Sequence, residues 1–121
     1  GISTGMALLG LTTITVYPRF DFLILACNQL VNHLDKMEMM SSGDMTPRVI
    51  IRVSVGAKEP INAGPQHTQD HTQAFKKMLT NVNVVELNEP EEIFSAFKTA
   101  YEREDSKPTL IVKYGEYYGK K

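Results

Sequence analysis

Four short runs rich in β-branched and apolar residues alternate with segments of helical periodicity, and this alternation sets the fold class. The predicted strands cover residues 12–17, 48–55, 82–87 and 109–114. The predicted helices cover residues 1–9, 20–39 and 70–79, and a last one begins at Asn88 and ends before Ser106. Strands separated by helices pair in parallel through right-handed crossovers. The sequence therefore predicts an α/β, three-layer domain with a mainly parallel sheet and helices on both faces.

Length and charge limit the number of domains and the kinds of partner that the chain can have. A chain of 121 residues can bury one core and is too short for two. Its 13 Lys and Arg residues nearly balance its 14 Asp and Glu residues, with no basic run, so no nucleic-acid or anionic-membrane partner is predicted. The longest apolar run, residues 22–27, is far too short to cross a bilayer. A single cysteine, Cys27, suits a reducing compartment, and we expect a cytoplasmic or mitochondrial-matrix protein.

The chain begins in the middle of a helical pattern. Gly1 is not an initiator methionine, and the first residues are typical of the last turns of a helix that Gly10 ends. We therefore expect the sequence to be a fragment that lacks its N-terminal part and any C-terminal domain.

The helix predicted over residues 20–39 has an apolar face and an opposite polar face. The apolar positions at helical spacing are Phe20, Leu23, Ile24, Cys27, Leu30, Val31, Leu34 and Met37, and the polar positions are Asp21, Asn28, Asn32, Asp35 and Lys36. In the first half, Phe22, Leu25 and Ala26 make the far side apolar as well. We expect a second chain or a cofactor to cover that surface.

Residues 56–69, GAKEPINAGPQHTQ, form a long loop, and such loops in small domains are more often functional than idle. Ligands of parallel sheets bind outside the carboxyl ends of the strands. The loops after Tyr17 and Val55 leave that edge, so Phe20, Phe22 and His67 are predicted to approach one another there.

Helix caps are predicted at two places. Asp70 followed by Gln73 resembles a capping box, and Asn88 precedes Pro90 and an acidic first turn. Each cap marks the end of the loop or strand before it.

Several signatures of catalysis and metal binding are absent. There is no dinucleotide or phosphate-loop glycine motif, no nucleophile elbow and no CxxC pair. His67 and His71 could offer two imidazoles to zinc, but without an evident third ligand no metal site is predicted. Cys27 is interpreted as core packing and His33 as a surface residue. The cluster Tyr114, Tyr117, Tyr118, Lys120 and Lys121 is interpreted as a frayed edge or linker.

Two stretches carry a family resemblance. The segment FDFLILACNQLVNHLDKMEMMSSG, with F-x-F, N-Q, N-H-x-x-K and M-S-S-G, resembles the beta subunit of thiamine-diphosphate-dependent 2-oxo acid dehydrogenases. GPQHTQ stands where that family carries its Q-H-S-Q loop. The opening GISTGMALLGL, then VVELNEPEEIFSAFKTAY and KYGEYYG, are similar to its other segments. The wider resemblance is to the transketolase-like pyrimidine-binding domain, which implies the pyrimidine type of the thiamine-diphosphate-binding fold over residues 1–121.

The resemblance also implies a site. Phe22 matches the phenylalanine that stacks on the cofactor's pyrimidine, Phe20 and Gln66 would join it in binding thiamine diphosphate, and His67 matches the catalytic loop histidine. Gln69 with Gln66 would position that loop. The diphosphate and magnesium would be held by an alpha-type subunit or domain in a homo- or hetero-oligomer, and the activating acidic residue lies about five positions before Gly1, outside this sequence.

Three functions stay open. The first is the pyrimidine-binding part of a 2-oxo acid dehydrogenase-type enzyme, inactive as an isolated chain. Pro18 and Leu25 depart from the usual residues of that group and leave the substrate undecided. GPQH also resembles the G-P-T-H loop of transketolases, which indicates a split transketolase or deoxyxylulose phosphate synthase. The third is a non-catalytic assembly domain.

Overall fold

The computed structural model describes residues 1–117, and within them the sheet has four parallel strands. The strands are β1 (Thr13–Tyr17), β2 (Val49–Val55), β3 (Asn83–Leu87) and β4 (Thr109–Tyr114), in the spatial order β1-β2-β4-β3. All three strand pairs are parallel, with Thr13 opposite Val49 and Ile50 opposite Thr109. Each strand lies within one residue of its predicted bounds.

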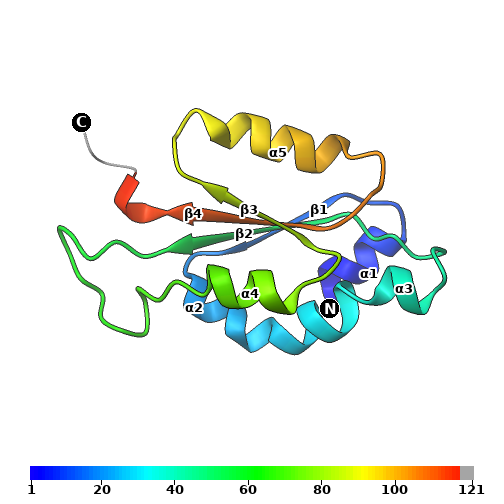
Figure 1. The fold of residues 1–121 in the computed structure, drawn as a ribbon, viewed down its shortest axis with the longest axis horizontal. Helices are drawn as coiled ribbons and strands as arrows, with labels where there is room; N and C mark the ends of the chain where they lie inside the picture. The colour runs from blue at the N-terminus through cyan, green and yellow to red at the C-terminus, as the bar shows by residue number, and fades with distance from the viewer. Residues whose placement is uncertain (118–121) are drawn as a thin grey trace.

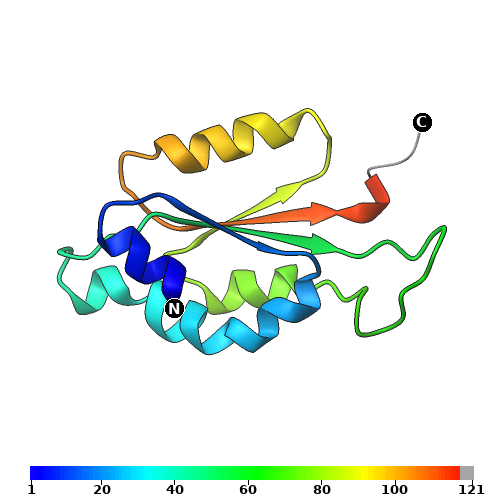
Figure 2. The ribbon, with the colours of Figure 1, turned by 180° about the vertical axis from the view of Figure 1, so that it is seen from behind.

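Helices cover both faces of the sheet, which confirms the predicted three-layer α/β architecture (Figures 1 and 2). The lower layer of Figure 1 contains α1 (Ile2–Leu8), α2 (Phe20–Leu23), α3 (Met37–Met40) and α4 (Thr72–Met78). Of the helices in residues 1–117, α5 (Glu92–Glu102) is the one on the upper face, and a short 3₁₀ turn (Gly115–Tyr117) follows β4. No helix in the described part of the chain is long and apolar enough to span a membrane.

The sheet separates two apolar clusters. Phe20, Leu23, Val53 and Phe75 belong to the larger cluster, between the sheet and the lower helices. The smaller cluster lies under α5 and contains Ile50, Leu87, Ala100 and Ile111. β2 and β4 contribute to both clusters, which explains why their sequences are nearly continuous apolar runs, as is typical of strands covered on both faces.

The helix predicted over residues 20–39 is not one regular helix. After α2 the chain forms a 3₁₀ turn (Ile24–Ala26), then a π-helical turn (Gln29–Leu34), and ends in α3. The wide turn is visible in the bond from Asp35 N to the carbonyl of Leu30, five residues back, at 2.9 Å. Tightening and widening shift the faces of the helix, so Ile24 is exposed and Asp35 is buried, opposite to the predicted pattern.

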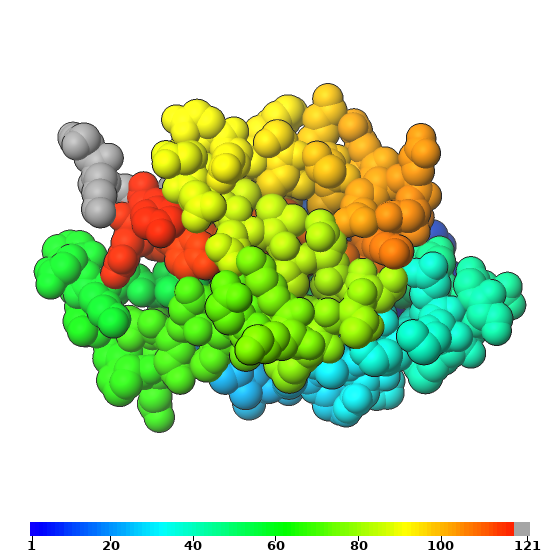
Figure 3. Space-filling view, viewed as in Figure 1, coloured from blue at the N-terminus to red at the C-terminus, as the bar shows by residue number. Residues whose placement is uncertain are grey.

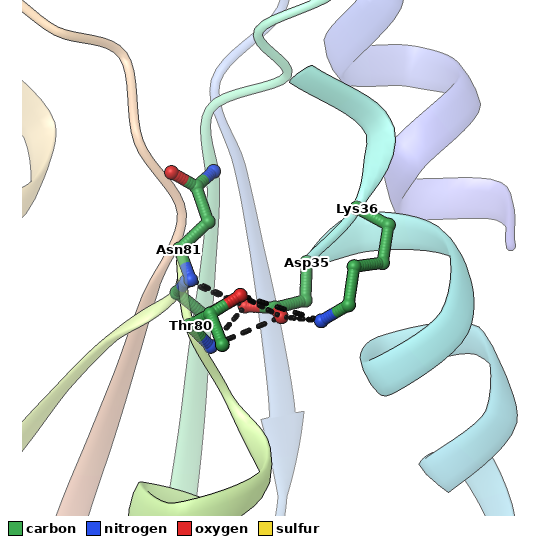
Figure 4. Close-up of polar contacts among 5 residues, drawn as sticks. Asp35, Lys36, Thr80 and Asn81 are labelled. Atoms are coloured by element: carbon green, nitrogen blue, oxygen red, sulfur yellow. Dashed lines mark hydrogen bonds and ion pairs between the residues drawn. The ribbon is translucent and has the colours of Figure 1, made fainter. Parts of the chain in front are cut away.

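The irregular turn ends at a buried carboxylate, that of Asp35. The residue is 1% exposed, and its carboxylate accepts hydrogen bonds from the loop before β3 (Figure 4). The donors are the backbone nitrogens of Thr80, Asn81 and Val82, at 2.8–3.1 Å, the Thr80 hydroxyl at 3.0 Å, and the Lys36 ammonium. Burial raises the pKa of Asp35, but the hydrogen bonds from Lys36 and the backbone outweigh it and lower the pKa to about 2.

Both predicted caps differ in detail from the structure. The carboxylate that satisfies the start of α5 belongs to Glu92, which accepts from the nitrogens of Asn88 (2.8 Å) and Glu89 (3.1 Å). Asp70 does act before α4: its Oδ1 accepts from Thr72 N at 3.0 Å, while the predicted partner Gln73 is exposed. Each helix starts later than predicted: the residue before α4 is His71 and the residue before α5 is Glu91, and neither side chain makes a cap hydrogen bond.

Candidate functional site

Two segments far apart in the sequence meet at the carboxyl ends of the strands. The chain leaves β1 at Pro18 and enters α2, which carries Phe22, and the loop after β2 carries His67. Figures 1 and 2 show α2 and this loop at the same end of the sheet. The ring centroids of Phe22 and His67 are 5.6 Å apart, and the rings are nearly perpendicular, at 88°. The predicted approach of these two residues is confirmed.

Phe22 is the first of three exposed apolar residues in this segment. It is 38% exposed, Leu25 is 91% exposed, and Ile24 between them is exposed too. Large apolar side chains that gather on one exposed segment are a sign of a binding surface. The expectation that a second chain or a cofactor covers this surface stays a prediction.

Phe20 lies elsewhere. It is fully buried at 0% exposure, packed against the ring of Phe75 at 5.3 Å and edge-on to His71 at 5.7 Å. Residues two apart on a helix project to nearly opposite sides. Phe20 is therefore a core residue and offers no surface to a ligand in this structure, unlike the direct cofactor contact that was predicted for it.

The loop that carries His67 packs directly on the end of β2. A Cβ built on Gly56 would lie 2.1 Å from the carbonyl oxygen of His67 and 3.2 Å from Arg19 Nε. Within the loop, the carbonyl of Gly64 accepts from His67 N and from the Thr68 hydroxyl, each at 3.1 Å. In the space-filling view the loop forms the left end of the molecule, beside the end of β4 (Figure 3).

A side-chain contact joins the loop to α2. Asp21 Oδ1 accepts a hydrogen bond from Gln69 Nε2 at 2.8 Å and a longer one from Gln69 N at 3.4 Å. Gln69 was expected to position the loop, but Asp21 was interpreted only as part of a polar helix face. Gln66, the other predicted glutamine, is exposed, and its side chain forms no hydrogen bond with residues 1–117.

A polar pocket of about 270 Å³ adjoins the loop at the ends of β2 and β4. Among its lining residues are Lys58, Thr68, Asp70 and Tyr114. Burial raises the pKa of Tyr114 above its ordinary value. A second cavity, of about 420 Å³, lies between α1, β1 and the segment 23–34, and its lining includes neither ring of the Phe22–His67 pair.

The predicted tyrosine cluster is described only in part. The rings of Tyr114 and Tyr117 are 5.3 Å apart and tilted by 49°. Tyr118, Lys120 and Lys121 lie outside the described residues.

The two loop histidines have different neighbours. His67 contacts the ring of Phe22, whereas His71 contacts the ring of Phe20. Among residues 1–117, no group of three or more His, Cys, Asp or Glu side chains is placed to hold a metal ion.

The sequence of residues 1–116 matches the model of the family described as transketolase, pyrimidine binding domain. The chain belongs to this family. Its members are thiamine-diphosphate enzymes, and the four-stranded parallel sheet with helices around it is consistent with the family fold. A search of curated proteins found no match.

An exposed aromatic ring next to an imidazole fits what this cofactor needs from the domain. A flat aminopyrimidine is well held by an aromatic face, and an imidazole can exchange protons near neutral pH. The residues at the sheet edge are therefore suited to the cofactor of the family.

Proposed function

We propose that this domain provides the pyrimidine-binding half of a thiamine-diphosphate site in an enzyme of the 2-oxo acid dehydrogenase type. The observation that carries the proposal is the perpendicular contact of Phe22 and His67, 5.6 Å apart at the carboxyl edge of the sheet. Membership of a thiamine-diphosphate family supports it.

Bound thiamine diphosphate supplies an electron sink for the loss of carbon dioxide from a 2-oxo acid. The chain's own residues have three tasks in this proposal. Phe22 stacks on the pyrimidine and, with its apolar neighbour Leu25, excludes water from that ring. The imidazole of His67 orients the substrate and carries a proton to or from it. Gln66, exposed in the same loop, donates a hydrogen bond to the bound group.

The diphosphate and its magnesium are assigned to a second polypeptide or domain of the alpha type. In this proposal the partner also covers the apolar patch at Phe22, Ile24 and Leu25, so the working unit is an oligomer. The isolated chain is then inactive.

The first test compares cofactor affinity in the assembled enzyme. Phe22→Ala should weaken thiamine diphosphate binding by about 3 kcal/mol, or roughly a hundredfold in Kd. The matched control is Phe94→Ala, since Phe94 is 77% exposed on α5 at the opposite face. Equal affinity of wild type and Phe22→Ala, measured by titration calorimetry, would rule out the stacking role.

The second test concerns His67. His67→Asn should lower kcat by roughly a hundredfold or more, as expected for loss of a proton-transferring group, with little change in cofactor affinity. His33→Asn is the control, because His33 is an exposed histidine on the π-helical turn (Gln29–Leu34), away from the loop that carries His67. A full kcat in His67→Asn would exclude a catalytic role.

Two alternatives predict different results. A split transketolase or deoxyxylulose phosphate synthase, which the GPQH sequence favours, would turn over ketose phosphates in place of 2-oxo acids. A non-catalytic assembly domain would form a stable oligomer with its partner and show no response to thiamine diphosphate and magnesium.

A further inference from the structure

One acidic side chain connects the two segments that form the site. Asp21 directly precedes Phe22, and its partner Gln69 lies two residues after His67. Asp21 Oδ1 accepts a hydrogen bond from the side-chain nitrogen of Gln69 and a longer one from its backbone nitrogen. One carboxylate oxygen thus bridges the helix that presents the phenylalanine and the loop that presents the histidine.

The bridge between Asp21 and Gln69 attaches the loop to α2, and the other hydrogen bonds of the loop do not attach it to another element. The remaining hydrogen bonds found for residues 57–69 run within the loop, to and from Gly64. Among the described residues, Asp21 is therefore the side chain through which hydrogen bonding attaches the loop to another element. The close approach of the His67 carbonyl to Gly56 is a packing contact between backbones, not a hydrogen bond.

The two oxygens of the Asp21 carboxylate differ in their hydrogen bonding to the described residues. Asp21 Oδ2 is buried and has no hydrogen-bond partner among residues 1–117. A buried acceptor without a donor lowers stability. The hydrogen bonds that this carboxylate makes with residues 1–117 go to Gln69, and the carboxylate charge strengthens them.

We propose that Asp21 is a positioning residue that fixes the His67 loop through Gln69 and so sets the contact between His67 and Phe22. Its bearing on catalysis rests on the proposed function, in which these two rings form the cofactor site. Without the bridge, the loop keeps its internal bonds and loses its orientation relative to α2.

The test uses three variants of the 121-residue chain. Gln69→Glu places two carboxylates face to face, and Asp21→Asn removes the charge from the helix side. The double variant sets an amide on α2 against a carboxylate on the loop, which allows the same bond in reverse polarity. Asp44→Asn and Gln73→Glu are the matched controls, since both residues are exposed and neither takes part in the bridge. The readout is the nuclear Overhauser effect between the Phe22 and His67 rings, with no cofactor present.

In Gln69→Glu we expect this effect to fall to about half or less, because losing a typical hydrogen bond shifts the equilibrium between the docked and the displaced loop by roughly fivefold. Asp21→Asn should cause a smaller decrease, and the double variant should recover most of the wild-type signal. Recovery by the second substitution is not expected of a merely structural change. An unchanged ring contact in Gln69→Glu, or no recovery in a double variant with the wild-type melting temperature, would overturn the proposal.

The same variants in the assembled enzyme test the consequence for catalysis. Gln69→Glu should lower kcat more than it alters the affinity for thiamine diphosphate, because Phe22 itself is unchanged. A wild-type assembly without thiamine-dependent turnover, combined with loss and recovery of the ring contact in the isolated chain, would support the bridge and count against the proposed function.

Discussion

The carbonyl oxygen of His67 lies against the α-carbon of Gly56, so closely that a Cβ at position 56 would stand 2.1 Å from it. Real side chains do not approach a backbone oxygen to that distance. Glycine at this position therefore allows the loop to return to the end of β2 and brings the His67 ring to Phe22.

Gly56→Ala should displace the loop. We expect a loss of about 1–3 kcal/mol in the free energy of unfolding, as for other overpacked sites, together with a weaker ring contact between Phe22 and His67. Urea denaturation and nuclear Overhauser measurements check both effects. Gly5→Ala is the control, because its Cβ would meet nothing within 4 Å and alanine favours a helix. Equal stability of the two variants would contradict the prediction.

Phe20 and Phe22 should differ sharply in their contribution to stability. Phe20 is fully buried, so Phe20→Ala should lower the free energy of unfolding by about 3–5 kcal/mol. Phe22→Ala should cost less than half of that, because its ring keeps part of its surface in water. Denaturant titration of both variants is the measurement, and a larger loss for Phe22→Ala would show that the assignment of Phe20 to the core and Phe22 to the surface is wrong.

Asp35 should make stability depend on pH in the acidic range. Its pKa is about 2 in the folded chain and 3.8 as the ordinary value, so the folded state binds the proton more weakly. The stabilisation is therefore present above pH 3.8 and is lost as the pH falls toward 2. Its size is about 2 kcal/mol.

The measurement is the free energy of unfolding of wild type and Asp35→Asn at neutral and acidic pH. The difference between the two should be largest at neutral pH and shrink below pH 3.8. Asp44→Asn, on an exposed loop, should follow the wild type throughout. A constant difference between wild type and Asp35→Asn would show that the carboxylate charge has no part in the stabilisation.

Arg48 should hold the end of α5 to the start of β2. Its guanidinium donates to the carbonyls of Tyr101, at 2.5 Å, and Arg103, and to the Ser106 hydroxyl at 3.2 Å. Arg48→Met should cost about 1.5–3 kcal/mol, the range for hydrogen bonds from a charged group. It should also speed amide hydrogen exchange in the last turn of α5. Lys98→Met, on the exposed side of α5, is the control, and equal exchange rates would argue against this tether.

Local sequence patterns were sufficient to predict an element where the residues that begin and end it lie in the same segment. Thr13–Tyr17 and Thr109–Tyr114 are strands because β-branched and apolar residues lie between proline or glycine breakers. Gly10, with φ of 93°, ends α1 as predicted. The parallel order of the strands also followed, because each is separated from the next by a helix.

Local sequence patterns did not predict which side chains are buried where residues distant in the sequence determine the burial. Asp35 has the spacing of a surface residue in an ideal helix, but the loop before β3 offers three backbone donors that draw it inward. Phe20 and Phe22 are equally apolar in the sequence, and only the position of the sheet determines which one is covered.

The sequence by itself determined the α/β class, the strands, and the edge at which Phe22 and His67 meet, because these depend on periodicity and on the geometry of parallel sheets. The tertiary structure decided the ring contact, the approach at Gly56 and the bridge from Asp21 to Gln69. These contacts join residues more than ten positions apart, and the free energy that selects them arises only when the loop, the helix and the sheet are packed together.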